Sequence, residues 1–89
     1  MTELLYRSNR ADLKGVATLA IEGEIDLYAG HHFKNDLSQM IDTDGAKRAI
    51  IDLSRVEFID SAGIGIIIGV LKRLRGGSRP TKRPVLTLV

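Results

Sequence analysis

Residues 48–75 read RAIIDLSRVEFIDSAGIGIIIGVLKRLR, and the order of apolar and small residues in this stretch decides the fold. Ala49–Leu53 is a short, nearly continuous apolar run of the kind found in strands that are buried on both faces. A polar connection at Ser54-Arg55 follows, and Val56–Ile59 resumes an extended pattern. The first half of the stretch therefore predicts strand structure that leads into a turn at Asp60-Ser61.

The turn leads into a helix predicted from about Ala62 to Arg75, in which apolar residues share one broad face. Asp60 and Ser61 are both residue types that cap a helix start, because a short side-chain oxygen accepts a hydrogen bond from a backbone N–H that the helix leaves unpaired. Isoleucine and glycine are poor helix formers, so tertiary burial must stabilise this helix. We expect it to be almost fully covered, with Gly65 and Gly69 allowing close packing against backbone.

The preceding residues predict a hairpin and a first helix. Leu4–Ser8 and Val16–Glu22 are candidate antiparallel strands, joined by a polar loop at residues 11–15. Gly23–Asp26 is expected to break the second strand, with Asp26 as the N-cap of a helix over Tyr28–Ile41. In that helix, apolar residues at i, i+4, i+7 and i+8 form a single stripe, made of Phe33, Leu37, Met40 and Ile41.

A last strand is predicted at Val85–Val89. The order strand, strand, helix, strand, helix, strand is typical of an α/β fold with a mixed β-sheet and helices packed on one face. The 89 residues and 44% hydrophobic content suit one small domain over residues 1–89. Its core is expected at about residues 4–76, with a basic loop and the last strand at 77–89.

The composition argues against several functional classes. Without cysteine, the chain has no disulfide framework and no thiolate metal site. His31 and His32 are adjacent on a predicted helix, so they point about 100° apart and cannot ligate one metal as an i, i+4 pair does. We expect exposed or half-packed histidines, no metal, no cofactor and no catalytic residue.

The charge is uneven along the chain. Six basic residues and no acid lie between positions 72 and 84, whereas the remaining seven basic and eleven acidic residues give the rest of the chain a net charge of −4. A basic segment with few aromatics favours a solvated tail over direct nucleic-acid binding. No targeting segment and no apolar run near the roughly 20 residues of a membrane span are visible, so we expect a cytoplasmic protein without membrane contact.

Ser61 is the most distinctive candidate for function. Its immediate surroundings lack the base and orienting group of a nucleophilic triad, and DSAGIG lacks the lysine and spacing of a phosphate-binding loop. A serine at a strand-to-helix turn is exposed, and phosphorylation there would add about −1.5 to −2 charge beside Asp60. The residues alone leave two interpretations open, which are a plain N-cap serine and a phosphorylation switch.

IIDLSRVEFIDSAGIGIIIGVLKRLR resembles the signature of STAS domains, in particular the bacterial anti-sigma factor antagonists. GEIDLYAG at residues 23–30 is similar to the family's turn into its first helix, and the resemblance covers roughly residues 14 to 77. It implies that Ser61 is phosphorylated by a cognate anti-sigma factor, a serine kinase of the GHKL type that supplies the ATP. It also implies that Asp26, Asp60, Ala62 and Gly63 surround the partner-facing surface.

The resemblance further implies that the unphosphorylated protein binds the anti-sigma factor and frees the sigma factor, and that a PP2C-type phosphatase restores this form. Ala62 replaces a second hydroxyl found in many members, and the C-terminal helix that follows the family's last strand is missing. Its absence would expose apolar sheet or helix surface and favour self-association or instability. The alternative function is a STAS-type scaffold or ligand-binding module without a phosphorylation cycle.

Overall fold

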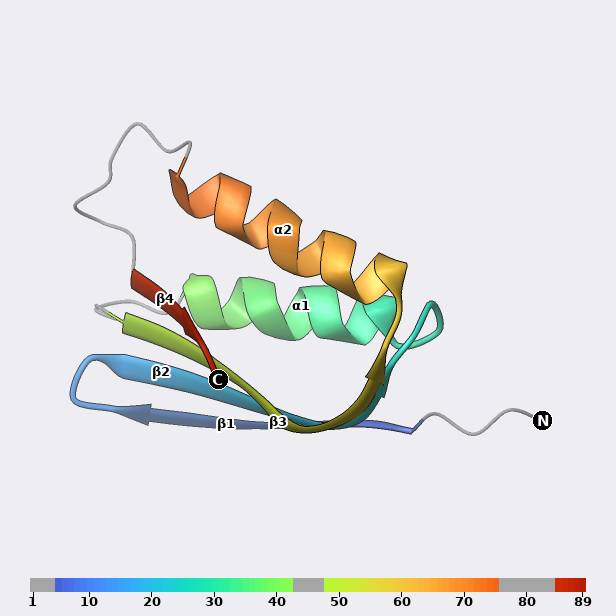
Figure 1. Cartoon of the computed structure of the whole chain (residues 1–89). Helices are drawn as coiled ribbons and strands as arrows, with labels where there is room; N and C mark the ends of the chain where they lie inside the picture. Colours follow the sequence, from blue (N-terminus) through green and yellow to red (C-terminus); the bar gives the residue numbers. More distant parts are fainter. Residues whose placement is uncertain (1–4, 43–47, 76–84) are drawn as a thin grey trace.

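The computed structural model describes residues 5–42, 48–75 and 85–89, which form a four-stranded sheet with two helices on one face (Figure 1). The strand order is β1-β2-β3-β4, with β1 antiparallel to β2, and β2, β3 and β4 parallel to one another. The predicted α/β fold is therefore confirmed. The elements in chain order are β1 (Tyr6–Leu13), β2 (Val16–Ile25), α1 (Gly30–Ile41), β3 (Arg48–Ile59), α2 (Ser61–Arg75) and β4 (Val85–Leu88).

The first hairpin is longer and its turn tighter than the sequence pattern indicated. β1 extends to Leu13, so residues 11–13 pair with β2 instead of forming a loop. Lys14 and Gly15 make the turn, with φ of 51° and 81°. Two consecutive residues with positive φ are typical of the two-residue turn whose twist matches that of the flanking strands. Leu4, the predicted start of the first strand, lies outside the described residues.

The sequence pattern predicted that the second strand ends at Gly23. In the structure, Gly23 instead forms a bulge within β2, and the strand continues to Ile25. The φ of Gly23 is +90°, and a Cβ at this position would lie 1.8 Å from the carbonyl oxygen of Leu5. The same oxygen accepts a hydrogen bond of 2.9 Å from the backbone N–H of Glu24. Glycine is therefore required here because another backbone passes too closely for any side chain.

The polar residues Ser54 and Arg55 lie inside β3, so the predicted connection between two short strands is wrong. Arg55 pairs with Glu22 and Val56 with Gly23 across the parallel ladder. The register shifts around the Gly23 bulge let the long strands β2 and β3 bend together toward the helices (Figure 1). This bend carries the carboxyl ends of both strands to the start of α2.

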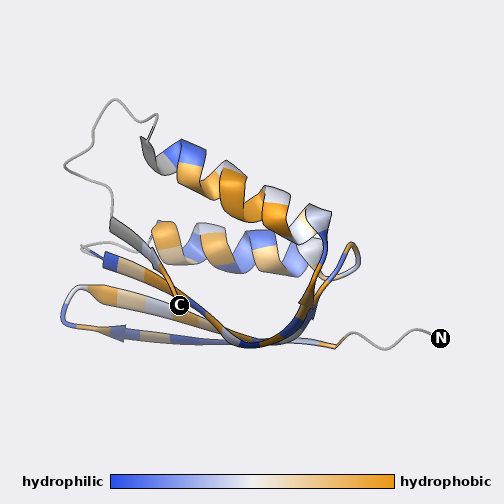
Figure 2. Ribbon diagram, in the orientation of Figure 1, coloured by the Kyte–Doolittle hydropathy of each residue, from blue (hydrophilic) through white to orange (hydrophobic). Residues whose placement is uncertain are grey.

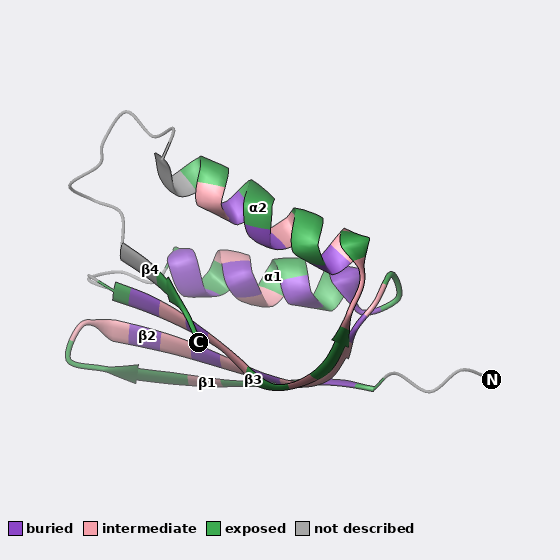
Figure 3. Ribbon diagram, in the orientation of Figure 1, coloured by how far each residue is buried: buried purple, intermediate pink, exposed green. Residues whose placement is uncertain are grey.

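The core lies between the sheet and the helices (Figure 3). The predicted apolar stripe of α1 is confirmed, since each of its four residues is buried. From the sheet, β2 supplies alternating side chains to the same core. The largest fully buried residues are Leu19, Ile21, Ile25, Phe33, Leu37, Met40 and Ile51.

Tyr6 joins β1 to α1 at the edge of the core. Its ring packs edge-on against Phe33, with ring centroids 6.3 Å apart, and its hydroxyl donates a hydrogen bond of 2.6 Å to Asp36. Burial, with the neighbouring Asp36 carboxylate, raises the pKa of Tyr6 well above its ordinary range. The phenol therefore remains protonated in the folded protein.

α2 is less covered than its apolar sequence suggested. Ile67 and Val70 are buried, but Ile64 and Ile68 are each 47% exposed. Figure 2 shows α2 as the more apolar helix, and Figure 3 shows exposed residues along its outer side. The expectation of almost full coverage is wrong because, within the described part of the chain, α2 packs on α1 and β3 and no element lies over its outer side.

Some expectations concern residues that the structure leaves undescribed. The end of the first helix beyond Asp42 and the basic loop within residues 76–84 belong to this group. Among the described elements none follows β4. No described helix is long and apolar enough to cross a membrane.

Candidate functional site

The carboxyl ends of β2 and β3 meet at one corner of the molecule. Ile25 pairs with Ile59 in the parallel ladder, and the backbone N–H of Asp60 donates a hydrogen bond of 3.1 Å to the carbonyl oxygen of Ile25. Asp26 and Ser61 each follow immediately on one of these strand ends. The structure therefore brings together the two sequence segments that carry the predicted site residues.

Asp60 caps α2, and Ser61 does not. The Oδ1 atom of Asp60 accepts a hydrogen bond of 3.1 Å from the backbone N–H of Gly63, and its carbonyl accepts one of 3.1 Å from Ile64. This arrangement satisfies an N–H that the helix leaves unpaired. The interpretation of Ser61 as a plain N-cap is therefore wrong.

Ser61 is the first residue of α2, and it is exposed. Within the described part of the chain, its hydroxyl has no hydrogen-bond partner. The positive end of the helix dipole lies at the same place and favours negative charge. Ser61 thus presents a hydroxyl to solvent at a position where a phosphate group is electrostatically tolerable.

Asp26 stabilises the turn before α1 instead of capping the helix directly. Its Oδ1 accepts a hydrogen bond of 3.0 Å from the backbone N–H of Ala29, which also donates to the Asp26 carbonyl at 3.1 Å. α1 begins at Gly30, and its N-cap position, Ala29, makes no side-chain cap. The predicted cap was wrong because the chain closes a separate turn at residues 26–29 before the helix starts.

Gly63 is buried where α2 sits on the strand ends. A Cβ at this position would lie 2.8 Å from side-chain carbons of both Ile25 and Ile59, and 3.1 Å from the Ile25 carbonyl oxygen. Only glycine permits this close approach, so Gly63 positions the start of α2. Ala62 is half-buried and faces the space between α1 and α2.

Large apolar side chains are exposed in each of the three segments that meet at this corner. Leu27 and Tyr28, directly after Asp26, are each 71% exposed, Phe58 in β3 is 50% exposed, and Ile64 in α2 is 47% exposed. These residues could not be predicted from the sequence pattern, because it placed Tyr28 in a helix and Ile64 on a buried helix face. Exposed apolar residues beside polar ones are typical of a protein-docking surface.

The remaining candidates for a chemical role are metal-ligating side chains and the two histidines of α1. Across residues 5–42, 48–75 and 85–89, no group of three or more His, Cys, Asp or Glu side chains is placed to hold a metal ion. His31 and His32 are exposed on α1, as expected. The His32 ring stacks on Tyr6, with centroids 6.3 Å apart and an interplanar angle of 25°, which gives it a packing role.

Comparison with known proteins agrees with the fold. The family model of the STAS domain matches residues 9–79. The anti-sigma-F factor antagonist RsfB of Mycobacterium tuberculosis is 36% identical over 64 residues, which cover 72% of this chain and 52% of that protein. The chain therefore spans about half the length of the curated relatives it matches.

Two solved structures share the architecture. The crystal structure of an anti-sigma factor antagonist from Mycobacterium paratuberculosis matches with a TM-score of 0.78 and 23% identity, covering 93% of this chain and 65% of that chain. The Bacillus cell fate determinant SpoIIAA in its phosphorylated form matches with a TM-score of 0.61 and 21% identity, covering 79% of this chain and 64% of that chain. At these identities the likeness confirms the fold.

Proposed function

The chain belongs to the STAS domain family, and we propose that it acts as an anti-sigma factor antagonist switched off by phosphorylation of Ser61. The observation that carries the proposal is the exposed Ser61 hydroxyl at the start of α2, with the capping role taken by Asp60. The name of the relative RsfB and the phosphorylated form of SpoIIAA support it.

In this proposal the chain is a phosphoryl acceptor and has no catalytic residues of its own. The Ser61 oxygen attacks the γ-phosphorus of ATP held by the partner, an anti-sigma factor of the GHKL serine-kinase type. The bond between that phosphorus and the bridging oxygen breaks, ADP leaves, and the hydroxyl proton passes to a base of the kinase. Exposure of Ser61 suits this role because the kinase must reach the oxygen from solvent.

The phosphate changes the charge of the docking surface more than it changes the fold. A phosphoserine adds about −1.5 to −2 charge at the N-terminus of α2, where the helix dipole partly offsets it. It also joins the carboxylates of Asp26 and Asp60, which already make this corner acidic. A partner surface docked here would face either repulsion between negative charges or a buried phosphate charge without a partner, and the complex would dissociate.

The proposed docking surface consists of Asp26, Asp60 and Ala62 together with the exposed apolar residues of the same corner. Those are Leu27, Tyr28, Phe58 and Ile64. Gly63 contributes by holding α2 against the strand ends, since it is buried. Apolar side chains at the centre of an interface provide affinity, whereas the acidic residues provide specificity and sensitivity to phosphate.

The cycle also needs an enzyme that removes the phosphate. We assign this role to a PP2C-type phosphatase, which would hydrolyse the phosphoserine and restore the binding form. The exposure of Ser61 makes the phosphate accessible to it. The proposal places the whole cycle in the cytoplasm, without direct nucleic-acid or membrane contact.

Incubating the chain with a candidate anti-sigma factor of the GHKL serine-kinase type and ATP, followed by mass spectrometry of peptides, tests the modification. We expect one phosphoryl group on Ser61 in the wild type and none in Ser61→Ala. Ser54→Ala is the matched control, because Ser54 is also exposed but lies in the middle of β3. An unmodified Ser61, with a kinase that phosphorylates another antagonist under the same conditions, would refute the proposal.

A further inference from the structure

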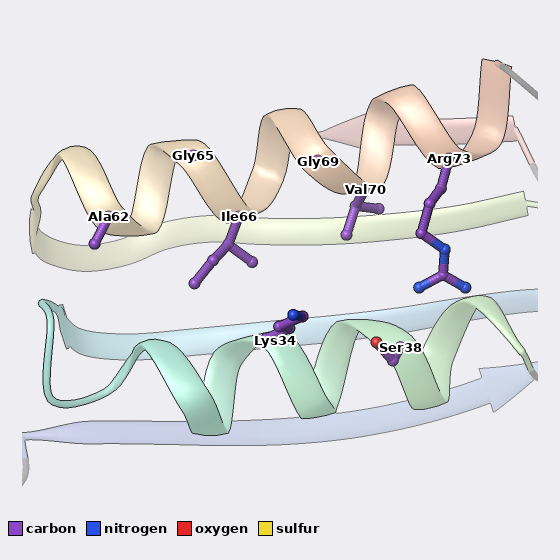
Figure 4. A pocket seen from close by; sticks show the side chains of 8 residues that line it. All are labelled: Lys34, Ser38, Ala62, Gly65, Ile66, Gly69, Val70 and Arg73. Atoms are coloured by element: carbon purple, nitrogen blue, oxygen red, sulfur yellow. The ribbon is translucent and has the colours of Figure 1, made fainter.

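An open groove of about 400 Å³ runs between α1 and α2 (Figure 4). Its α2 wall consists of small or apolar residues, from Ala62 through Gly65, Ile66 and Gly69 to Val70, and Arg73 closes one end. Lys34 and Ser38 line it from α1. The volume falls within the range of about 300–1,000 Å³ that is typical of sites for small organic ligands.

Gly65 and Gly69 of α2 keep this groove open. A Cβ at Gly65 or at Gly69 would meet nothing within 4 Å, so the predicted close packing against backbone is wrong. Glycine inside a helix costs roughly 0.5–1 kcal/mol of stability relative to alanine. No contact among the described residues requires glycine at either position. The effect of the two glycines is that no side chain obstructs the apolar wall of the groove.

The polar part of the groove is cationic. Among the residues that the structure describes, Lys34 and Arg73 are the charged ones in its lining, and none of the lining residues is acidic. Figure 4 shows the Arg73 side chain extending from α2 toward α1, where Ser38 lies on the facing turn. The combination of two cations and a hydroxyl with an apolar wall is complementary to an amphiphilic anion.

Two acids near the groove lie outside its lining, Asp36 in α1 and Asp42 directly after the end of α1. Asp42 approaches one guanidinium nitrogen of Arg73 at 3.6 Å, with the side chains 68% and 48% exposed respectively. Exposed ion pairs of this kind contribute little free energy, so a ligand carboxylate can compete for Arg73, which has five N–H donors. Asp36 accepts a hydrogen bond from Tyr6 and is thereby directed toward β1.

We propose that this groove binds a small organic carboxylate with an apolar chain. The carboxylate contacts Arg73, Ser38 and Lys34, and the chain lies along Ile66, Val70 and the two glycines. Binding in this groove is a different activity from the phosphorylation of Ser61 and goes beyond the proposed function, although Ala62 belongs to both the groove and the proposed docking surface. It gives the fold a ligand-binding capacity that depends on α1 and α2 together.

The test uses octanoate as the probe, titrated into the isotopically labelled 89-residue chain while backbone amide resonances are followed by NMR. We expect saturable shifts at Lys34, Gly65 and Gly69. Octan-1-ol, with the same chain but no charge, should bind at least about tenfold more weakly, because it lacks a charge-assisted hydrogen bond. Equal affinity of the alcohol, or shifts that never saturate, would overturn the proposal.

Substitutions of charged residues inside and outside the groove distinguish binding in the groove from nonspecific adsorption of octanoate to the protein surface. Arg73→Gln and Lys34→Gln should each weaken octanoate binding about tenfold, whereas Lys72→Gln, an exposed cation of α2 outside the lining, should leave it unchanged. Asp42→Asn should strengthen binding, because it removes the competing carboxylate. A uniform effect of all the lysine and arginine substitutions would contradict a built site.

Filling the groove provides the last test. Gly69→Leu places a side chain in the open space and should abolish binding while the amide spectrum of the sheet stays that of the wild type. Gly65→Leu repeats the test one turn earlier, so that one poorly folded variant does not decide the outcome. Undiminished octanoate binding in a folded variant of either kind would show that the ligand lies elsewhere.

Discussion

The backbone N–H of Asp60 donates a hydrogen bond of 3.1 Å to the carbonyl oxygen of Ile25. This bond ties together the ends of the two central parallel strands, β2 and β3. It places Asp26 and Ser61 at one corner, although 35 positions separate them in the sequence. The geometry of the proposed switch therefore depends on how closely α2 can approach the strand ends.

Substitution of Gly63 by alanine tests this approach. The added Cβ would lie 2.8 Å from Ile25 and Ile59, so we expect Gly63→Ala to lower the free energy of unfolding by about 1–3 kcal/mol. Gly69→Ala is the matched control in the same helix. It should raise the free energy of unfolding by roughly 0.5–1 kcal/mol, because its Cβ meets open space. Urea unfolding measures both, and effects of equal sign would contradict the assigned roles of the two glycines.

Substitutions at the start of α2 distinguish the cap from the proposed phosphorylation site. Asp60→Ala removes the acceptor for the Gly63 N–H and should cost about 1 kcal/mol of stability, whereas Asp60→Asn should retain most of it. Ser61→Ala should change the free energy of unfolding by less than about 0.5 kcal/mol. Thermal unfolding of the three variants checks this order, and a larger loss in Ser61→Ala than in Asp60→Ala would show that Ser61 is the cap.

Tyr6 should make stability fall in alkaline solution. Burial beside Asp36 raises its pKa in the folded protein, whereas the unfolded chain titrates near pH 10. The unfolded state therefore loses its proton first, so this contribution is fully present below about pH 10 and is lost as the pH rises above that value. Urea unfolding at several pH values between about 8 and 12 measures the loss.

Tyr6→Phe should remove this part of the alkaline slope. At neutral pH it should also cost about 1–2 kcal/mol, because Asp36 loses its hydrogen-bond donor. Tyr28→Phe is the control, since Tyr28 is 71% exposed. An alkaline slope unchanged in Tyr6→Phe would mean that other groups cause it.

The exposed apolar residues near Ser61 should matter for partner binding and not for folding. Leu27→Ala and Tyr28→Ala should each weaken the complex with the anti-sigma factor about tenfold or more, at little cost in stability. Leu13→Ala is the matched control, because Leu13 is 70% exposed like Leu27 and Tyr28 but lies at the distant hairpin turn. Calorimetric titration measures the affinity of each variant for the anti-sigma factor. Equal affinity of the three variants would show that the docking surface lies elsewhere.

Much of the fold could be predicted from periodicity. The stripe of α1, the extended residues before Ser61 and the helix after it follow from side-chain patterns that repeat with the helix and strand periods. The errors arise where a tertiary contact overrides a local signal. Gly23 looked like a strand end, but the carbonyl of Leu5 makes it a bulge, and residues 11–13 looked like a loop but pair with β2.

The candidate site could be predicted in part. Sequence pattern and family resemblance pointed to Ser61, Asp26, Asp60, Ala62 and Gly63, but they could not assign the cap, because adjacent Asp and Ser are both suitable residue types. The exposure of Leu27 and Ile64 depends on which faces the helices present after packing. The groove between α1 and α2 likewise requires the separation of two helices, which no local pattern contains.

The most direct test of the central claim is the dissociation constant of the complex with the anti-sigma factor, measured for the wild type, Ser61→Ala and Ser61→Asp. We expect Ser61→Ala to bind like the unphosphorylated wild type. Ser61→Asp should bind roughly 100-fold more weakly, a difference of about 2.7 kcal/mol. Equal dissociation constants for all three proteins, together with unchanged affinity after phosphorylation of the wild type, would contradict a switch at Ser61.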